Sequence, residues 1–264
     1  MTVIKPVNVL GLLSKSSLEG VYVALLNTDG VDVFDYGRLQ HIPYDEALRE
    51  KIRPLLGTCP YTPEAVAEFQ AVNRELTVFH AEIVKDYIAA NGFEVDVIGY
   101  EGINLTNYAS GGETGLLGDG KLLAELTGIR VVCNFHAADI RAGGQGAPLD
   151  PVYYNALCAD IGKPLAVVNI SGITRVTWIG SYGEMTAFDT GPGNAAIDEW
   201  VRKHGGMHMD YNGKLAITGK VNEQIVATMM RHKYFAKYPP KSTNRSEFVE
   251  KLEHLEGLSL EDGA

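Results

Sequence analysis

A carboxylate beside a cluster of glycines is the strongest candidate for chemistry in this sequence. Asp139 opens the segment Asp139–Pro151, which reads D-I-R-A-G-G-Q-G-A-P-L-D-P. Glycines permit positive φ and let a ligand approach bare backbone, and the two prolines stiffen the exit of the segment. A carboxylate that the fold desolvates and points at a ligand can act as a general base. Two alternatives stay open: an ordinary strand-to-helix loop, and an Asp139 that caps a turn or pairs with Arg141.

Two hydroxyl-rich turns follow apolar segments at matched places in the two halves of the chain. Backbone N–H groups and hydroxyls at such turns suit the binding of a phosphate. The side chains in question are Ser14, Ser16 and Ser17 in the first half and Asn169, Ser171, Gly172 and Thr174 in the second. Because either turn alone is typical of a simple hairpin, the prediction of phosphate binding depends on their matched placement in the two halves. Lys15 is ambiguous, because its ammonium could pair with a phosphate while its side chain could fill the space that the phosphate needs.

The third candidate, D-T-G-P-G-N over Asp189–Asn194, leads directly into a predicted helix. A helix N-terminus attracts anions, so Thr190 or Asn194 could contact a phosphate and Asp189 could hold a water bound to Mg²⁺. The alternative, weighed equally, is that Asn194 only caps the helix.

Composition limits the class of protein. The chain has 264 residues, of which 45% are hydrophobic and 21% charged, values that describe a globular protein, and this length favours two domains. The net charge of -10 argues against nucleic acid or an anionic membrane as a partner, but not against a phosphorylated ligand. The scattered cysteines suggest neither a disulfide framework nor a zinc site. We expect no leader and no membrane span, and therefore a cytoplasmic protein.

Apolar periodicity predicts a pattern of strands and a helix that occurs twice, which is an internal structural repeat. The strands expected in the first half cover 7–13, 20–26, 31–36, 95–99 and 129–133, and the sequence also allows one over 102–107. The helices expected there cover 43–56, 63–90 and 121–126. The second half has a helix over 152–161, strands over 165–170, 174–179 and 185–189, and helices over 194–203, 220–231 and 246–255. We interpret the histidines at 80, 204 and 208 as structural or surface residues.

The duplicated scheme with paired phosphate turns resembles the actin-like ATPase and sugar-kinase superfamily. More specifically, Asp139–Pro151 and Phe188–Asp198 (F-D-T-G-P-G-N-A-x-I-D) resemble motifs of the bacterial anhydro-N-acetylmuramic acid kinases. Shorter matches follow in the family's order, so that the resemblance runs from about Val9 to the last residue. They are Gly11–Gly20, Val97–Gly99, Gly118–Asp119, Asn169–Ile173 and Pro239–Ser242.

The resemblance implies an α/β fold of two actin-like (ribonuclease H-like) domains with mixed sheets flanked by helices. We assign them to 1–130 and 131–264, the second one incomplete. The implied enzyme binds ATP and Mg²⁺ between the domains, opens the anhydro bridge of an amino sugar with water and phosphorylates O6. Its product is N-acetylmuramic acid 6-phosphate, formed during peptidoglycan recycling. The implied partners are the amino sugar and ATP, without nucleic acid or membrane.

The resemblance also implies roles for individual residues. Asp139 takes the place of the base that activates the attacking water. The positions implied to contact ATP and its metal are Ser14, Lys15, Ser16, Ser17, Glu19, Gly20, Asn169, Ser171, Gly172, Thr174, Asp189, Gly191, Gly193 and Asn194. Those implied to contact the sugar are Glu101, Asn104, Gly143, Gly144 and Gln145. No residue is assigned as a direct ligand of a metal.

The sequence also departs from the family's motifs. Where the family reads S-G-T-S-x-D-G, this chain has Lys15, Ser16 and Glu19, and Ser171 replaces a glycine of the second turn. H-G-Q-T is replaced by E-G-I-N at 101–104, and D-F-R by N-F-H at 134–136. The family continues beyond Ala264 with strands and a glycine-rich adenosine-binding segment. These departures favour an alternative: a degenerate or truncated homologue that binds sugar, nucleotide or a partner without catalysis, with an exposed apolar face and a compensating homodimer.

Overall fold

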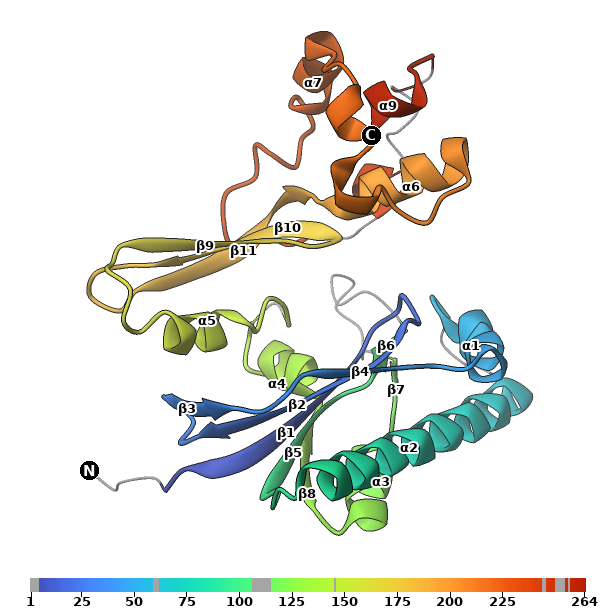
Figure 1. Cartoon of the computed structure of the whole chain (residues 1–264), viewed down its shortest axis with the longest axis vertical. Coiled ribbons are helices and arrows are strands. Elements are labelled where there is room, and N and C mark those ends of the chain that lie inside the picture. The colour runs from blue at the N-terminus through green and yellow to red at the C-terminus, as the bar shows by residue number, and fades with distance from the viewer. Residues whose placement is uncertain are drawn as a thin grey trace. The chain divides into compact units, whose positions relative to one another are not determined.

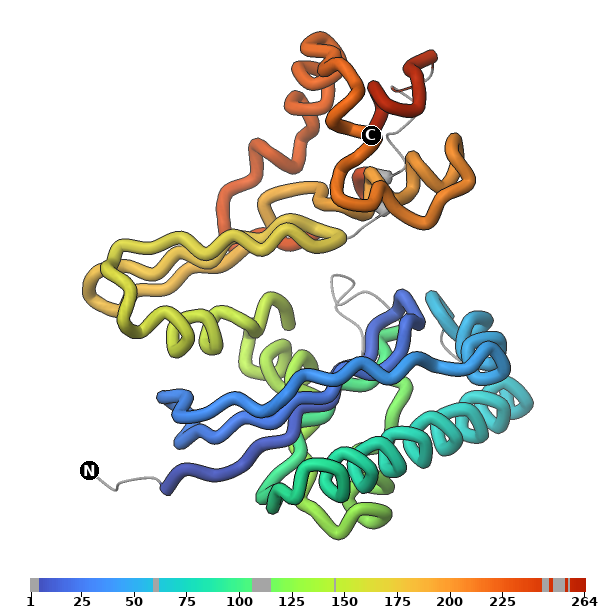
Figure 2. Tube along the Cα trace, in the orientation of Figure 1, coloured from blue at the N-terminus to red at the C-terminus, as the bar shows by residue number. Residues whose placement is uncertain are grey.

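A mixed sheet and a smaller antiparallel sheet organise the computed structural model of this chain (Figures 1 and 2). The structure describes residues 5–58, 62–105, 115–144, 146–243, 246–249, 255 and 257–264. The chain divides into two units, Met1–Leu149 and Asp150–Ala264. The predicted α/β class is confirmed, and the first unit contains the expected mixed sheet flanked by helices. The extent of the two actin-like domains stays a prediction.

The sheet of the first unit has six strands, in the order β3-β2-β1-β5-β8 with β4 also paired to β2. Its strands are β1 (Val7–Ser14), β2 (Gly20–Thr28), β3 (Val33–Tyr36), β4 (Gln40–Pro43), β5 (Val97–Glu101) and β8 (Arg130–Cys133). β1 runs antiparallel to β2 but parallel to β5, and β5 runs parallel to β8. The carboxyl ends of β1, β5 and β8 therefore lie at one edge of the sheet, which brings Ser14 and Glu101 to that edge.

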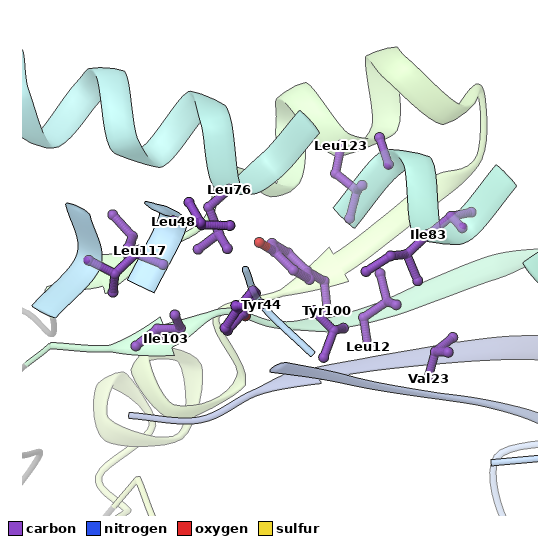
Figure 3. Close-up of a cluster of buried hydrophobic side chains, with 14 of the residues drawn as sticks. Leu12, Val23, Tyr44, Leu48, Leu76, Ile83, Tyr100, Ile103, Leu117 and Leu123 are labelled. Carbon is purple, nitrogen blue, oxygen red and sulfur yellow. The ribbon is translucent and has the colours of Figure 1, made fainter. Parts of the chain in front are cut away.

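Two helices, α2 (Pro63–Asn91) and α3 (Gly120–Thr127), pack on one face of this sheet (Figure 1). α2 begins where Thr62 caps it, accepting from the Ala65 N–H, and it ends at Gly92 in the left-handed conformation. Alternating residues of β1 and β2, such as Leu12 and Val23, meet the apolar stripe of α2 in a buried core (Figure 3). The remaining elements are α1 (Glu46–Ile52), η1 (Arg53–Leu55), β6 (Ile103–Asn104), β7 (Leu116–Leu117) and α4 (Phe135–Arg141).

The first unit differs from the prediction in four elements. The sequence pattern missed β4 and β7, and the helix predicted from residue 43 begins at Glu46 because Asp45 caps it. The sequence pattern also missed α4. Asp139 was expected in a loop, but it lies on this helix. α4 follows β8 after a single residue, Asn134, which has a φ of 59°. One residue between strand and helix, followed by seven helical residues, leaves too little periodicity to recognise.

The second unit is built on a three-stranded antiparallel sheet in the order β11-β10-β9. Its strands are β9 (Leu165–Ile170), β10 (Ile173–Ile179) and β11 (Met185–Pro192). Its helices are α5 (Pro151–Leu157), α6 (Asn194–Gly205), η3 (Tyr211–Gly213), η4 (Ala216–Thr218), α7 (Glu223–Met229), α8 (Ser246–Val249) and α9 (Leu260–Gly263). Trp200, Val201 and Leu255 centre a second core. β11 extends past its predicted end at residue 189, so Gly191 and Pro192 belong to a strand and not to a turn.

In the described parts of the chain, no helix combines the length and the apolar composition that crossing a membrane requires.

Candidate active site

The carboxylate of Asp139 is held by the loop that follows α4. Its Oδ2 accepts a hydrogen bond from the Gly146 N–H at 2.7 Å, and its main-chain oxygen accepts one from the Gly144 N–H at 2.9 Å. A Cβ at Gly144 would lie 2.1 Å from Oδ2, so any other residue there would displace the carboxylate. Gly143 has a φ of 93°, which also favours glycine. The carboxylate thus stabilises the turn, as one of the sequence-based alternatives expected, and it lies against Gly144 of the glycine cluster.

A cavity of about 490 Å³ adjoins this loop, lined by Glu101, Phe135, His136, Ala138 and Leu149. Glu101 ends β5 and His136 lies in the first turn of α4, with Nε2 of the imidazole 3.0 Å from Oε1 of the carboxylate. Asn104 Nδ2 donates to the same Oε1 at 2.9 Å. Two of the predicted sugar contacts, Glu101 and Asn104, are therefore in contact with each other. A third, Gln145, lies outside the described residues.

Ser14, the first residue predicted to contact a phosphate, points into the core of the first unit. Its buried hydroxyl accepts from Tyr44 OH at 2.7 Å and lies 2.8 Å from His80 Nε2. Tyr100 OH lies 3.1 Å from the other ring nitrogen, His80 Nδ1. Burial lowers the pKa of His80 to about 3 and raises the pKa of Tyr44 to about 12, so both are neutral near pH 7. The hydroxyl of Ser14 is thus engaged within the protein.

Lys15, Ser16, Ser17 and Glu19 of the first turn are exposed, whereas Leu18 and Gly20 are buried. Ser16–Ser17 form its tip, and the Lys15 ammonium lies 4.9 Å from the centre of the Tyr22 ring. Tyr22 OH donates to Glu19 Oε2 at 3.1 Å. A Cβ at Gly20 would meet the Ile42 carbonyl oxygen at 2.1 Å, so this position needs glycine for close packing of β2 on β4. Lys15 and Glu19, which both depart from the family's motif, contact the same tyrosine.

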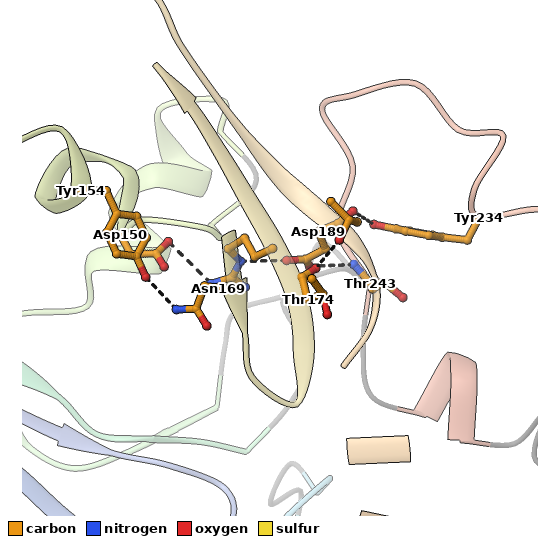
Figure 4. A network of polar contacts seen from close by, with 9 residues as sticks. Asp150, Tyr154, Asn169, Thr174, Asp189, Tyr234 and Thr243 are labelled. Carbon is orange, nitrogen blue, oxygen red and sulfur yellow. Dashed lines mark hydrogen bonds and ion pairs between the residues drawn. The ribbon is translucent and has the colours of Figure 1, made fainter. Parts of the chain in front are cut away.

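In the second unit, the other two candidate motifs lie against each other. A cavity of about 310 Å³ is lined by Asn169, Ser171, Gly172, Ile173 and Arg175. The Asn194 N–H donates to the Ser171 carbonyl oxygen at 2.7 Å, and a Cβ at Gly193 would lie 2.2 Å from that oxygen. Asn169 Nδ2 donates to Tyr154 OH at 2.7 Å, which fixes the end of β9 to α5 (Figure 4).

Asp189 is buried, with 2% of its surface exposed, and it is ion-paired to Arg175. Arg175 Nε lies 2.8 Å from Oδ1, the Thr243 N–H donates to Oδ2 at 3.0 Å, and Tyr234 OH donates to the main-chain oxygen at 2.7 Å (Figure 4). Arg175 also lies 3.6 Å from Asp150 Oδ1. The Asp189 carboxylate is thus engaged within the protein, and its predicted contact with a water bound to Mg²⁺ stays a prediction.

Arg175 is the residue that sequence reasoning missed. It sits opposite Asp189 in the β10–β11 register, so a charged residue within the apolar strand pattern was the signal that could have found it. In the described ranges, no group of three or more acidic, histidine or cysteine side chains is arranged to hold a metal ion.

The remaining predicted residues of the second unit have local structural contacts. Thr174 Oγ1 donates to the Pro192 carbonyl oxygen at 2.8 Å, and a Cβ at Gly191 would meet the Phe235 ring at 2.8 Å. The N-cap of α6 is Gly193, without a side-chain hydrogen bond, and Asn194 is the first helical residue. The alternative that Asn194 caps the helix is therefore wrong.

Comparison with known proteins relates this arrangement to one family. Residues 7–259 match the family described as anhydro-N-acetylmuramic acid kinase. The chain is 44% identical over 259 residues to a protein of that name from Paramagnetospirillum magneticum, covering 97% of this chain and 71% of the relative. It is 44% identical over 255 residues to the protein of the same name from Rhodospirillum rubrum, and the match covers 96% of this chain and 67% of the relative. It is 40% identical over 256 residues to the protein of the same name from Acidiphilium cryptum, and the match covers 97% of this chain and 70% of the relative. With both long motifs inside the matched range, the chain belongs to the anhydro-N-acetylmuramic acid kinase family, a family of sugar kinases.

Proposed function

We propose that this chain converts 1,6-anhydro-N-acetylmuramic acid and ATP to N-acetylmuramic acid 6-phosphate and ADP. Family membership supports the kind of reaction, and the names of the relatives supply the sugar. The observation that carries the proposal is the Asp139 carboxylate, which accepts from the Gly146 N–H and lies on α4, the helix whose residues Phe135, His136 and Ala138 line a cavity of about 490 Å³. A fixed carboxylate beside a sugar-sized cavity suits a general base.

In the proposed reaction, Asp139 accepts a proton from the water that attacks C1 of the sugar. The C1–O6 bond breaks as the bond from water to C1 forms, and O6 attacks the γ-phosphorus and displaces ADP. Mg²⁺, when bound to the ATP phosphates, neutralises charge that develops on the transferring group. We assign no side chain of this protein as its ligand, because Asp189 is paired with Arg175. Main-chain groups of the Lys15–Gly20 and Ser171–Gly172 turns are the proposed phosphate contacts.

An assay of ADP release with the anhydro sugar and Mg·ATP tests this proposal. We expect turnover by the wild-type chain and a loss of about 10³-fold in kcat for Asp139→Asn, which keeps the shape but cannot accept the proton. Asp160→Asn is the matched control, since Asp160 is an exposed carboxylate after α5. Absence of ADP release above buffer, or an Asp139→Asn variant as fast as wild type, would contradict the proposal.

Binding without catalysis is the second candidate function. It is favoured by two engaged side chains, the Ser14 hydroxyl inside the core and the Asp189 carboxylate on Arg175. Calorimetry with Mg·ATP and with the sugar separates the two functions. Micromolar binding of both ligands with turnover supports the kinase, whereas binding of either one without ADP release supports this second candidate.

We further infer a cytoplasmic role in peptidoglycan recycling, which rests on membership of the family alone. Loss of growth on the anhydro sugar after deletion of the gene, restored by the wild-type chain but not by Asp139→Asn, is the expected outcome.

A further inference from the structure

Both ring nitrogens of His136 face hydrogen-bond acceptors. Nδ1 contacts the Gly146 carbonyl oxygen, and Nε2 lies 3.0 Å from Glu101 Oε1. A neutral imidazole has one N–H donor and one acceptor nitrogen, while the imidazolium has two donors. Two acceptors therefore require a proton on each ring nitrogen, or a protonated Glu101. Because a carboxyl group is ordinarily a much stronger acid than an imidazolium, the proton belongs to His136.

The surroundings of His136 stabilise this charge. The side chains of His136 and Glu101 are 21% and 17% exposed, so water only partly screens their attraction. Among the residues that the structure describes, the titratable groups near the pair include Asp139, one turn further along α4, and Cys133 at the end of β8, which is itself near Asp119. The negative charges of Glu101 and Asp139 favour a cation at His136. Burial, together with Asp119 and Glu101, raises the pKa of the Cys133 thiol, which keeps this thiol neutral.

Gly146 joins this cation to the candidate base. Its carbonyl oxygen contacts His136, and its N–H donates to Asp139 Oδ2 at 2.7 Å. His136 and Asp139 are three residues apart on α4, so both lie on one face of the helix. Gly146 has a φ of 76°, and a Cβ there would come within 3.0 Å of the Ile140 side chain. One glycine is thus fixed from both sides by two side chains of the same helix.

We propose that His136 is a positioning residue, held as an imidazolium between Glu101 and Gly146, that keeps Gly146 in place and through it the Asp139 carboxylate. Loss of its proton would set the lone pair of one ring nitrogen against a carboxylate or carbonyl oxygen. The ring then turns, the Gly146 carbonyl is released, and Asp139 loses its N–H partner. This role in catalysis rests on the proposed kinase function, but the charge of His136 and its link to Gly146 do not.

Nuclear magnetic resonance of ¹⁵N-histidine protein tests the charge without any substrate. At pH 7.5 we expect both ring nitrogens of His136 to be protonated, with the signal assigned through its absence in His136→Gln. Glu101→Gln removes the carboxylate, so His136 should become neutral at this pH and the Gly146 amide signal should move. A neutral His136 in the wild-type chain, or a Gly146 amide unchanged in His136→Gln, would overturn the proposal.

Kinetics test the positioning role. His136→Gln should lower kcat by about tenfold or more while KM for ATP stays within about twofold, because a small misplacement of a base is costly. His136→Arg, whose guanidinium can donate to both acceptors, should keep kcat within about threefold of wild type. In Glu101→Gln the alkaline limb of the pH profile should move down by about one unit. His208→Gln, at an exposed histidine of the second unit, is the control for histidine loss.

The outcomes separate this inference from the proposed function. A wild-type rate in His136→Gln, or equal losses in His136→Gln and His136→Arg, would overturn the role of the charge even if the wild-type chain turns over the sugar. If the wild-type chain shows no turnover, the proposed function fails, and the resonance measurements alone decide the charge of His136 and its link to Gly146.

Discussion

At the scale of single residues, the candidate site depends on how closely backbone approaches one carboxylate. Asp139 touches the position where Gly144 would carry a side chain and bonds to the Gly146 N–H. A hydrogen bond from the backbone fixes the direction of the carboxylate. The glycines of this segment therefore allow the backbone to approach Asp139 closely, and the Asp139 carboxylate in turn determines the shape of the loop that a ligand would contact.

Gly144→Ala is expected to abolish most activity while leaving the protein folded. The new methyl group would lie 2.1 Å from Asp139 Oδ2, so the carboxylate must move, and kcat should fall by about 10²-fold. Gly162→Ala is the control, since a Cβ there meets nothing within 4 Å. The ADP-release assay and a thermal melt measure the two effects. Equal kcat values in both variants would contradict the close contact.

His80 predicts a pH dependence of stability. Burial lowers its pKa to about 3 in the folded state, against about 6.5 in the unfolded chain. Above pH 6.5 both states are neutral at this residue. Below it the unfolded chain binds a proton that the folded state does not, so the free energy of unfolding should fall by about 1.4 kcal/mol per pH unit as the pH drops toward 3.

Urea unfolding at pH 7.5 and pH 5.0 measures the contribution of His80 to this pH dependence. The contributions of the other titratable groups cancel when the decrease in the free energy of unfolding is compared between variants. His80→Gln should lose the contribution of residue 80 and show a smaller decrease between the two pH values. His208→Gln should keep the wild-type decrease, since His208 is exposed. Identical decreases in His80→Gln and wild type would contradict a neutral, buried His80.

At the scale of elements, long periodic segments were predictable and short ones were not. α2 and the strands of both β-β-β groups follow from apolar spacing and caps, and they lie close to their expected bounds. β4, β7 and α4 have too few residues for a period to show. The contacts of the Ser14 and Arg175 side chains could not be predicted either. Which face of the sheet a side chain at a strand end points to depends on the strand register, and the sequence alone does not give that register.

The segment after α7 is held to β11 by Asp189. Tyr234 OH donates to its main-chain oxygen and the Thr243 N–H to its carboxylate. Tyr234→Phe should lower the free energy of unfolding by about 1 kcal/mol or more, since a buried acceptor loses its donor, and should speed tryptic cleavage at Lys237 and Lys241. Tyr238→Phe is the control, because Tyr238 is 91% exposed. Equal cleavage rates in the two variants would contradict this attachment.

At the scale of the whole molecule, the sheet of the second unit exposes apolar side chains. Val168 and Ile170 on β9 are 58% and 63% exposed, and they share a face with Trp178 through the β9–β10 register. Within the described residues, β9 pairs only with β10, and it carries no charged side chain. An uncharged, open strand edge favours pairing with another chain, so self-association stays a prediction for this protein.

Val168→Lys should reduce that self-association, because a charge on an edge strand opposes pairing. Sedimentation velocity over a range of concentrations is the measurement, with a shift from a larger species toward the monomer as the expected result. Tyr182→Lys adds the same charge at a loop residue that is 94% exposed, and it should change nothing. The same species in the wild-type chain and Val168→Lys would contradict a role for this edge.

The two contacts of Gly146 make the length of the loop after α4 a property of the site. Gly146 lies seven residues beyond Asp139 and ten beyond His136, and it must reach both side chains at once. A helix rises about 1.5 Å per residue, so its two anchors stand about one turn apart and leave no slack for an inserted or deleted residue. Across natural variants of this protein, we therefore expect substitutions at positions 141 and 142, glycine at 143 and 144, and a constant number of residues between Asp139 and Gly146. Variants with an insertion or deletion in this loop should have lost activity.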